Sequence, residues 1–445
     1  MLPLLASVAL AAASAHSGGL RFIEDDYAGA VTRARSEHKP IVSDSWASWC
    51  HTCLSMQRYV FPDPGLRPVK DAAVYLSIDT ENPRNKEFVD RFPLDAWPTF
   101  LVIDPEDGTV LGRWVGSATP NEFRSFVQQG VEALRAKANP SPADAEMRKG
   151  YEARAMRDFP AAAAAYGRAL QLTAASDPAR PGRLALYAFA LSRVKTEDSN
   201  RDCVALGLAE MNAAGNSGVA AGIADVVAGC ARELPKDDPK AAQALRESTQ
   251  KMETLVRDPG ASLSVDDRSD AMATLADIYD DAGRHADALA MMRRRVALLE
   301  GAAKKAPDHT MASTFDAHRV DSYLYLGQPK KAETLLSARE KEMSADYNPP
   351  ARLARVYFEE KKLPEAEKAV DRALAKMTRG QRQIGILGLK AKILAAQGKP
   401  TGDVIREQLA IFRDLPRTQQ NPDTERSLTK ALAEAGKQAG NTGAR

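Results

Sequence analysis

Residues 39–60 read KPIVSDSWASWCHTCLSMQRYV, and this stretch decides the fold of the first part of the chain. Residues 41–46 form a short run that follows Pro40, which predicts a β-strand. The residues from Cys50 to Val60 come soon after and predict a helix. A Cys-x-x-Cys pair therefore stands where a strand gives way to the first turn of a helix.

This placement gives the two cysteines different chemical roles. Cys50 is expected at the helix N-terminus, where unpaired backbone N–H groups and the helix dipole stabilise a thiolate, the reactive form of cysteine. Cys53 lies one turn further on, so its sulfur faces the same way and can close a disulfide. Cys50 is then the residue that exchanges with a substrate sulfur, and Cys53 resolves the mixed disulfide.

A Cys-x-x-Cys pair can also be half of a zinc site. A zinc site needs further ligands, and no second Cys or His pair at metal-ligand spacing stands nearby. The sequence therefore favours a redox-active disulfide and predicts neither a metal nor a cofactor.

Helical and strand-like segments alternate across residues 20–137. Helices are expected at 27–37, 50–60, 85–92 and 121–137, and strands at 41–46, 73–79, 99–104 and 109–115. The Pro-Glu-Asp-Gly turn at 105–108 joins the last two strands into a hairpin. Alternation of this kind predicts an α/β layer fold.

The segment 20–137 resembles thioredoxins, and more closely the periplasmic thioredoxin-like domain of membrane disulfide-interchange reductases. Besides the two cysteines, the resemblance rests on Asp44, six residues before Cys50, and on Trp97-Pro98-Thr99. Residues 59–64 also resemble the continuation of the active-site helix in the interchange branch.

The resemblance implies roles for several further residues. Asp44 matches a buried acid that assists proton transfer at the second cysteine. Pro98 matches the cis-proline that packs against the cysteine pair, and Trp49, Trp97 and Thr99 flank the substrate groove. Trp97 is bulkier than the usual residue at its position. Two other interpretations stay open, in which Asp44 is a capping or surface carboxylate and Trp97 is plain core.

Strand signals end at the linker, residues 138–142, and helices recur in pairs over residues 143–438. Small residues and one aromatic return at fixed offsets, as in Gly150, Ala153, Ala162, Tyr166 and Ala169, and again in Ala354, Tyr357, Ala366, Val370 and Ala373. These offsets resemble the tetratricopeptide repeat, a pair of antiparallel helices. Units are expected near Ala143, Arg183, Ser217, Arg268, Ser313, Tyr347 and Gln381, with a capping helix at Thr424–Gln438. The alternative is a helical bundle without repeats.

The two remaining cysteines, Cys203 and Cys230, lie on expected helices on either side of the turn Ala214-Gly215-Asn216-Ser217-Gly218. Both are equally distant from its centre, which places them at the same height in an antiparallel helix pair. We predict a structural disulfide worth roughly 3 kcal/mol on the chain-entropy model. The alternative is two buried free thiols.

The N-terminal residues predict export. Residues 1–15 are apolar and end in Ala13-Ser14-Ala15, which resembles a signal peptide with a periplasmic or secreted destination, although no Lys or Arg precedes the apolar run. The alternative is an Ala-rich disordered tail. Later segments fall short of the ~20 apolar residues that span a bilayer. The chain has 61 basic and 59 acidic residues without a basic stripe, so no nucleic-acid partner is expected.

The sequence supports two functional hypotheses. In the first, the chain is a thiol-disulfide oxidoreductase for exported proteins: Cys50 and Cys53 act on protein thiols and disulfides, and the repeat array docks a peptide or protein partner. In the second, the thioredoxin-like domain is a non-catalytic peptide clamp in an assembly scaffold. Retention of both cysteines, Asp44 and Pro98 favours the enzyme.

Overall fold

A computed structural model describes residues 19–378 and 380–442 of the chain. The expected signal peptide, residues 1–15, lies outside the described residues. Within the described part, no helix combines the length and apolar character that crossing a membrane requires.

The first part of the chain folds around a five-stranded mixed sheet with the strand order β1-β3-β2-β4-β5. The strands are β1 (Phe22–Glu24), β2 (Ile41–Trp46), β3 (Val74–Asp79), β4 (Thr99–Ile103) and β5 (Val110–Val115). β2 is central because it pairs in parallel with β3 and antiparallel with β4. The redox pair therefore follows the most enclosed strand of the sheet.

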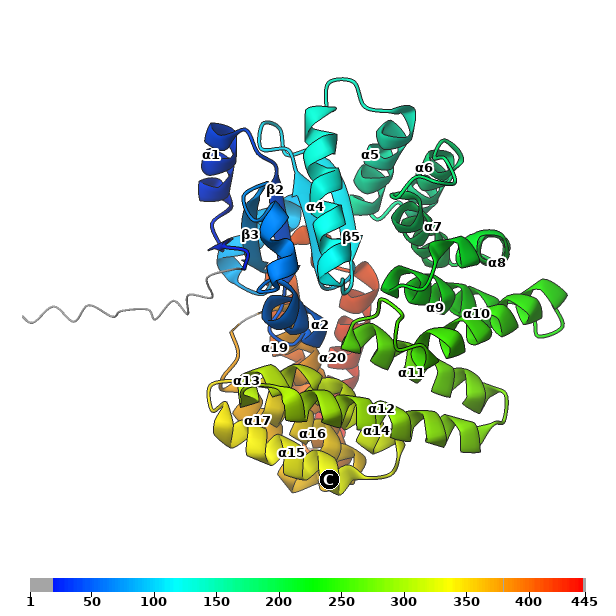
Figure 1. The fold of residues 1–445 in the computed structure, drawn as a ribbon. Coiled ribbons are helices and arrows are strands. Elements are labelled where there is room, and N and C mark those ends of the chain that lie inside the picture. The colour runs from blue at the N-terminus through cyan, green and yellow to red at the C-terminus, as the bar shows by residue number, and fades with distance from the viewer. Residues whose placement is uncertain (1–18, 379, 443–445) are drawn as a thin grey trace, which may run out of the picture.

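Helices cover both faces of this sheet (Figure 1). They are α1 (Tyr27–Glu37), α2 (His51–Ser55), α3 (Lys86–Arg91) and α4 (Pro120–Arg135), with short 3-10 helices at Pro64–Val69 and Pro83–Asn85. Ile41 packs with α1 and α3, whereas its neighbour Val42 packs with α4 on the opposite face, as alternation along a strand requires. The expected helix over 50–60 is split, because α2 continues as a π-helical turn at Met56–Val60.

The rest of the described chain is helical and forms successive antiparallel pairs. The pairs are α5 (Pro142–Ala155) with α6 (Phe159–Gln171), α7 (Arg180–Val194) with α8 (Glu197–Glu210), α9 (Gly218–Arg232) with α10 (Pro239–Arg257), α11 (Val265–Asp281) with α12 (His285–Lys305), α14 (Asp316–Tyr325) with α15 (Pro329–Glu342), α16 (Asn348–Glu359) with α17 (Leu363–Leu374), and α18 (Gln381–Ala396) with α19 (Gly402–Asp414). A short α13 (His309–Ala312) precedes α14. The predicted fold class, an α/β thioredoxin-like domain followed by an all-α solenoid, is confirmed.

Small residues let the two helices of a pair approach closely. A Cβ atom at Gly150 of α5 would lie 2.2 Å from the ring of Tyr166 on α6. Tyr166 is itself fully buried, so its ring has no room to move aside. A small residue is therefore required at position 150, because the helix that carries Tyr166 packs directly against it.

The helical array curves around the α/β domain (Figure 1). At one end, Arg154 of α5 donates hydrogen bonds of 2.9 and 2.7 Å to the carboxylate of Asp95. At the other end, the Lys86 ammonium donates to the Asp414 carbonyl at 3.1 Å. The α/β domain thus lies in the hollow of the array.

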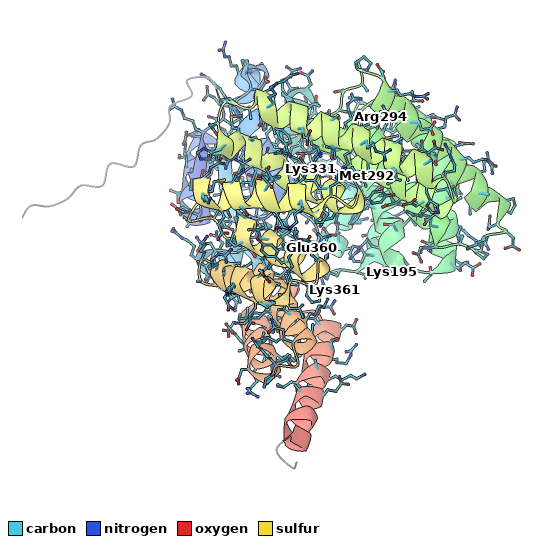
Figure 2. All side chains as sticks on the ribbon, turned by 90° about the horizontal axis from the view of Figure 1, so that it is seen from below. Lys195, Met292, Arg294, Lys331, Glu360 and Lys361 are labelled. Carbon is cyan, nitrogen blue, oxygen red and sulfur yellow. A yellow bond between two sulfur atoms is a disulfide. The ribbon has the colours of Figure 1, made fainter. Side chains whose placement is uncertain are left out.

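The final helix, α20 (Pro422–Thr442), extends beyond the expected cap at 424–438. Its side chains are exposed or half-buried through residue 436. Seen from below, α20 projects away from the body of the molecule (Figure 2).

A disulfide joins Cys203 in the middle of α8 to Cys230 near the end of α9, with Cα atoms 6.3 Å apart. The two helices approach this closely at Gly207, where an added Cβ would lie 2.5 Å from the Val227 side chain. Gly229 has open space around its Cα, so only the first of these two glycines makes the close approach possible.

We expect Gly207→Ala and Gly229→Ala to change stability in opposite directions. The first forces a methyl group into Val227 and should lower the free energy of unfolding by about 1–3 kcal/mol. The second adds a better helix former in open space and should raise it by up to about 1 kcal/mol. Urea denaturation of the full chain measures both, and equal effects of the two substitutions would contradict the packing at Gly207.

Candidate active site

The redox pair stands at the N-terminus of α2. Cys50 is the N-cap residue, and its sulfur accepts a hydrogen bond of 3.1 Å from the Cys53 backbone N–H. A disulfide joins the two cysteines, whose Cα atoms are 5.2 Å apart. Cys50 retains 5% of its exposure and Cys53 none, so an incoming sulfur can reach only Cys50. An attacking Cys50 and a resolving Cys53 require this asymmetry, and the two roles stay predictions.

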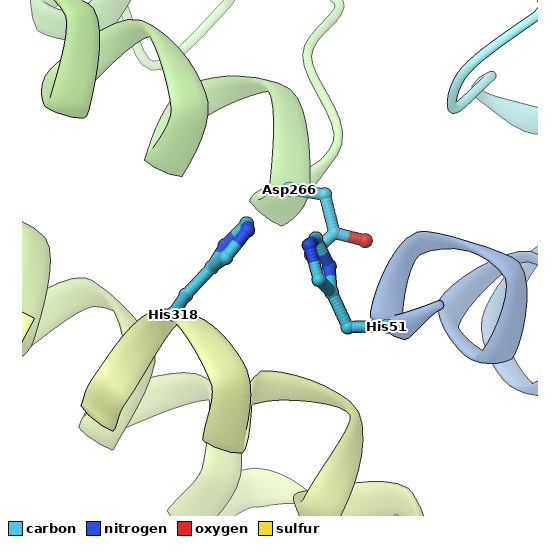
Figure 3. A group of neighbouring side chains, drawn as sticks. All are labelled: His51, Asp266 and His318. Atoms are coloured by element: carbon cyan, nitrogen blue, oxygen red, sulfur yellow. The ribbon is translucent and has the colours of Figure 1, made fainter. Parts of the chain in front are cut away.

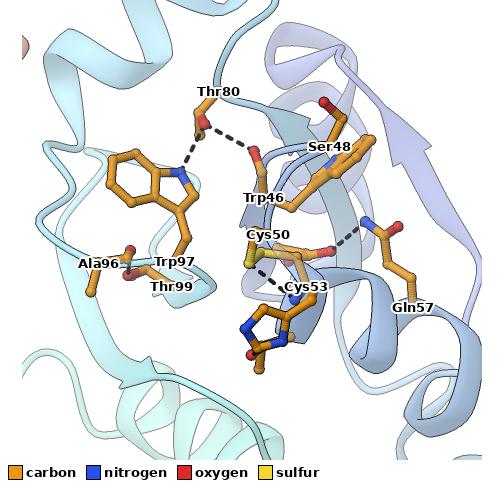
Figure 4. The surroundings of a disulfide bond; sticks show 12 residues. Trp46, Ser48, Cys50, Cys53, Gln57, Thr80, Ala96, Trp97 and Thr99 are labelled. Carbon is orange, nitrogen blue, oxygen red and sulfur yellow. Dashed lines mark hydrogen bonds between the residues drawn. A yellow bond between two sulfur atoms is a disulfide. The ribbon is translucent and has the colours of Figure 1, made fainter. Parts of the chain in front are cut away.

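Three tryptophans pack against the cysteines, namely Trp46, Trp49 and Trp97. Figure 4 shows Trp46 and Trp97 beside the cysteine pair. The indole Nε1 of Trp97 donates a hydrogen bond of 2.9 Å to the Thr80 hydroxyl. That hydroxyl in turn donates to the carbonyl of Trp46, the last residue of the central strand, at 2.9 Å. Trp97 is therefore held in a fixed orientation beside the redox pair.

The segment after Trp97 enters β4. The Trp97–Pro98 peptide bond is cis, and Pro98 is buried. Thr99 begins β4, is also buried, and donates its hydroxyl proton to the Ala96 carbonyl at 2.8 Å. The structure thus brings Trp97 against the cysteines and buries Pro98 and Thr99 beneath it, while the part each plays toward a substrate stays a prediction.

Asp44 is buried in the central strand, with 1% of its surface exposed. One carboxylate oxygen accepts a hydrogen bond of 3.2 Å from the Gln57 side chain, and the other has no hydrogen-bond partner. Burial raises the pKa of Asp44 to about 7, and the nearby Glu24 carboxylate adds to the rise, while the Gln57 hydrogen bond opposes it. A carboxyl group that titrates near neutral pH can accept and return a proton in the physiological range.

The helical array covers the loop that carries the redox pair. The Ser48 hydroxyl donates to the Tyr347 hydroxyl at 3.2 Å, and the Asn348 amide donates to the Ser48 carbonyl at 3.1 Å. Trp49 packs against the core of the array, and the Arg382 guanidinium lies 5.7 Å from its ring centroid. Trp49, which the sequence assigned to substrate binding, is therefore an interdomain contact in this structure.

A cavity of about 530 Å³ lies between the redox site and the array. Thr52 and Trp97 line it on one side, and α7, α9 and α11 line it on the other. Asp270 and Asp277 of α11 face this space. The cavity therefore lies next to the redox helix and has carboxyl groups on its far wall.

His51, between the two cysteines, meets residues that sequence reasoning missed. Its ring centroid lies 3.8 Å from that of His318 on α14, and its Nδ1 lies 3.8 Å from Asp266 Oδ1 on α11. Burial, together with the charges of His51, Arg295 and Arg352, holds the pKa of His318 well below its usual value. Nothing in the local pattern could reveal this cluster, because its members come from three distant segments.

Comparisons with known proteins agree with this geometry. The family model of the thioredoxin-like domain matches residues 27–130. The thiol:disulfide interchange protein DsbD of Pseudoalteromonas atlantica is 29% identical over 115 residues, which are 25% of this chain and 18% of that protein. A thioredoxin H-type of Oryza sativa subsp. indica is 29% identical over 117 residues, or 26% of this chain and 88% of the relative. The chain thus spans less than a fifth of the DsbD protein that it resembles.

Among solved structures, a tetratricopeptide repeat protein from Parabacteroides merdae is 13% identical, with a TM-score of 0.39 over 65% of this chain and 98% of that one. The repeat organisation rests on this chain's own helix pairs and on the close approach at Gly150. Residues 27–130 are a thioredoxin-like domain, and the chain joins this domain to an array of antiparallel helix pairs.

Proposed function

We propose that this chain is a thiol-disulfide oxidoreductase that acts on exported proteins. The observation that carries the proposal is the asymmetric burial of the Cys50–Cys53 disulfide at the N-terminus of α2, beside Trp97. A substrate sulfur exchanges with Cys50, and Cys53 then displaces it, so that one disulfide is formed for each one broken. Asp44 exchanges a proton with the Cys53 thiol during this second step.

The array contributes to the active site itself. Concave surfaces of such arrays commonly bind ligands, and here the concave side faces the thioredoxin-like domain. A cavity of about 530 Å³ is the size of a small-molecule site, so it fits part of an extended segment rather than a folded domain. We infer that substrates enter as extended segments and that α7, α9 and α11 select among them.

Export to the periplasm or outside the cell is part of this proposal. It is supported by the apolar segment at residues 1–15 and by the pairing of all four cysteines, because disulfides persist in oxidising compartments.

A glutathione titration of the full-length protein tests the proposed chemistry. After equilibration, free thiols are alkylated and the peptides are identified by mass. The Cys50–Cys53 pair should titrate as one two-electron couple, with a potential between about −270 and −120 mV, the span of thioredoxin-fold proteins. Cys203–Cys230 serves as an internal structural disulfide. A Cys50–Cys53 disulfide that stays oxidised in strongly reducing buffer would instead favour the non-catalytic scaffold.

A further inference from the structure

His51, Asp266 and His318 converge where the thioredoxin-like domain meets the array (Figure 3). Each offers one ligand atom, and these three atoms all lie within 4.8 Å of one another. Ligand atoms around a tetrahedral Zn²⁺ ion, at bond lengths near 2.05 Å, are separated by about 3.4 Å. Side-chain rotations that move each ligand atom by up to about one ångström would bring the three atoms to that spacing.

One oxygen of the Asp266 carboxylate is buried and has no hydrogen-bond partner in the described part of the chain. Asp266 retains 2% of its exposure, and its Oδ1 atom has no hydrogen-bond partner among the described residues. The His51 Nδ1 atom, at 3.8 Å, is too far away for a hydrogen bond. A buried carboxylate oxygen without a partner is costly, and a cation between Asp266 and the two imidazoles would remove that cost.

The surroundings of His318 suit a metal ligand. Its Nδ1 atom lies 2.9 Å from the Ser269 hydroxyl, which itself accepts a hydrogen bond of 2.8 Å from Arg295. A metal-bound histidine usually makes such a hydrogen bond with the nitrogen that faces away from the ion. The Nε2 atom of His318 contacts Asp270 Oδ1 at 3.2 Å, so an ion would bind Nε2 in place of this contact.

Asp270 supplies a further oxygen on the same helix face. It follows Asp266 by one turn of α11, and residues four apart share a face. The donor set is then two imidazole nitrogens with one or two carboxylate oxygens. This combination suits a divalent transition-metal ion, Zn²⁺ among them, and leaves room for a water or substrate atom.

We propose that His51, Asp266 and His318 form a divalent transition-metal site that joins the redox helix α2 to α11 and α14 of the array. His51 belongs to one domain, and the other two ligands belong to the second domain. Metal binding therefore holds the array closed over the redox loop, and separation of the domains breaks the site. The proposal does not depend on the catalytic activity of Cys50.

Calorimetric titration of the oxidised, chelator-stripped full-length protein with Zn²⁺ tests this site. Oxidation keeps all four cysteines in disulfides, so thiolates do not contribute ligands. We expect one equivalent to bind with a Kd below about 10 µM. Co²⁺ in place of Zn²⁺ should give visible absorption bands from a four- or five-coordinate site.

Asp266→Asn and His318→Gln should each weaken Zn²⁺ binding by at least about 10- to 100-fold. The matched control is His285→Gln, since His285 is exposed and pairs with Asp280 at 2.7 Å elsewhere in the array. Its affinity should equal that of the unaltered protein. His51→Gln, at the partly exposed first residue of α2, provides a third ligand variant if either buried substitution prevents folding. Absence of binding, or binding that survives loss of these ligands, would overturn the proposal.

Discussion

Cys50→Ser is expected to abolish thiol-disulfide exchange by the full-length protein, with a rate at least about 10³-fold lower. Serine cannot form the mixed disulfide. Cys53 cannot replace Cys50, because its side chain is fully buried behind it. The rate is measured by chromatography, from the conversion of a short unfolded peptide with one internal disulfide by the reduced protein.

Cys53→Ser tests the second step of the exchange, in which the mixed disulfide is resolved. It keeps the exposed attacking thiol and removes the resolving one, so it should accumulate the peptide as a mixed disulfide on Cys50. Replacing Cys203 and Cys230 together by alanine provides the control, because that disulfide lies in α8 and α9. Turnover by Cys50→Ser at the rate of the unaltered protein would exclude the proposed mechanism.

Local patterns in the sequence predict most of the helices and strands near the redox site. The predicted helix at 27–37 and the strand at 41–46 match α1 and β2 residue for residue. The sequence does not predict strand β1, because this strand has only three residues and is stabilised by pairing with β3, far along the chain. The seven expected repeat units all coincide with helix pairs, because small residues at fixed offsets mark helix crossings directly.

The sequence predicts the two cysteines at the centre of the site, but it does not predict the residues that surround them. The Cys-x-x-Cys spacing and its position after a strand indicate Cys50 and Cys53 without knowledge of the rest of the fold. The closure of the array over that loop depends on long-range pairs such as Ser48 with Tyr347, whose partners carry no local signature. The sequence therefore predicts Trp49 as a substrate contact but gives no sign that its ring also packs on the array.

Asp44→Asn should stabilise the oxidised protein at neutral and alkaline pH. The pKa of Asp44 is about 7 in the folded state against 3.8 for the ordinary carboxyl, because burial disfavours its charge. Between these values the folded chain holds a proton that the unfolded chain releases. The contribution of Asp44 to stability is therefore highest below pH 3.8 and falls as the pH rises to about 7, for a total of up to about 4 kcal/mol.

The asparagine variant resembles the protonated acid and avoids this loss. Its free energy of unfolding should equal that of the unaltered protein near pH 4 and exceed it by up to about 4 kcal/mol at pH 8. Urea denaturation across this pH range measures the difference. Asp71→Asn is the control, because Asp71 is an exposed carboxylate of the same domain and should leave the pH dependence unchanged.

The same substitution should slow disulfide exchange while it raises stability. With Asp44 as the proton acceptor for Cys53, the exchange rate of the unaltered protein rises with pH through about 7, where this carboxyl ionises. Asp44→Asn should lose that inflection and react about 10²-fold more slowly at pH 7. Because the expected changes in rate and stability have opposite signs, general damage to the fold cannot produce both. A variant with an unchanged pH–rate profile would leave Asp44 as a buried carboxyl without a part in the exchange.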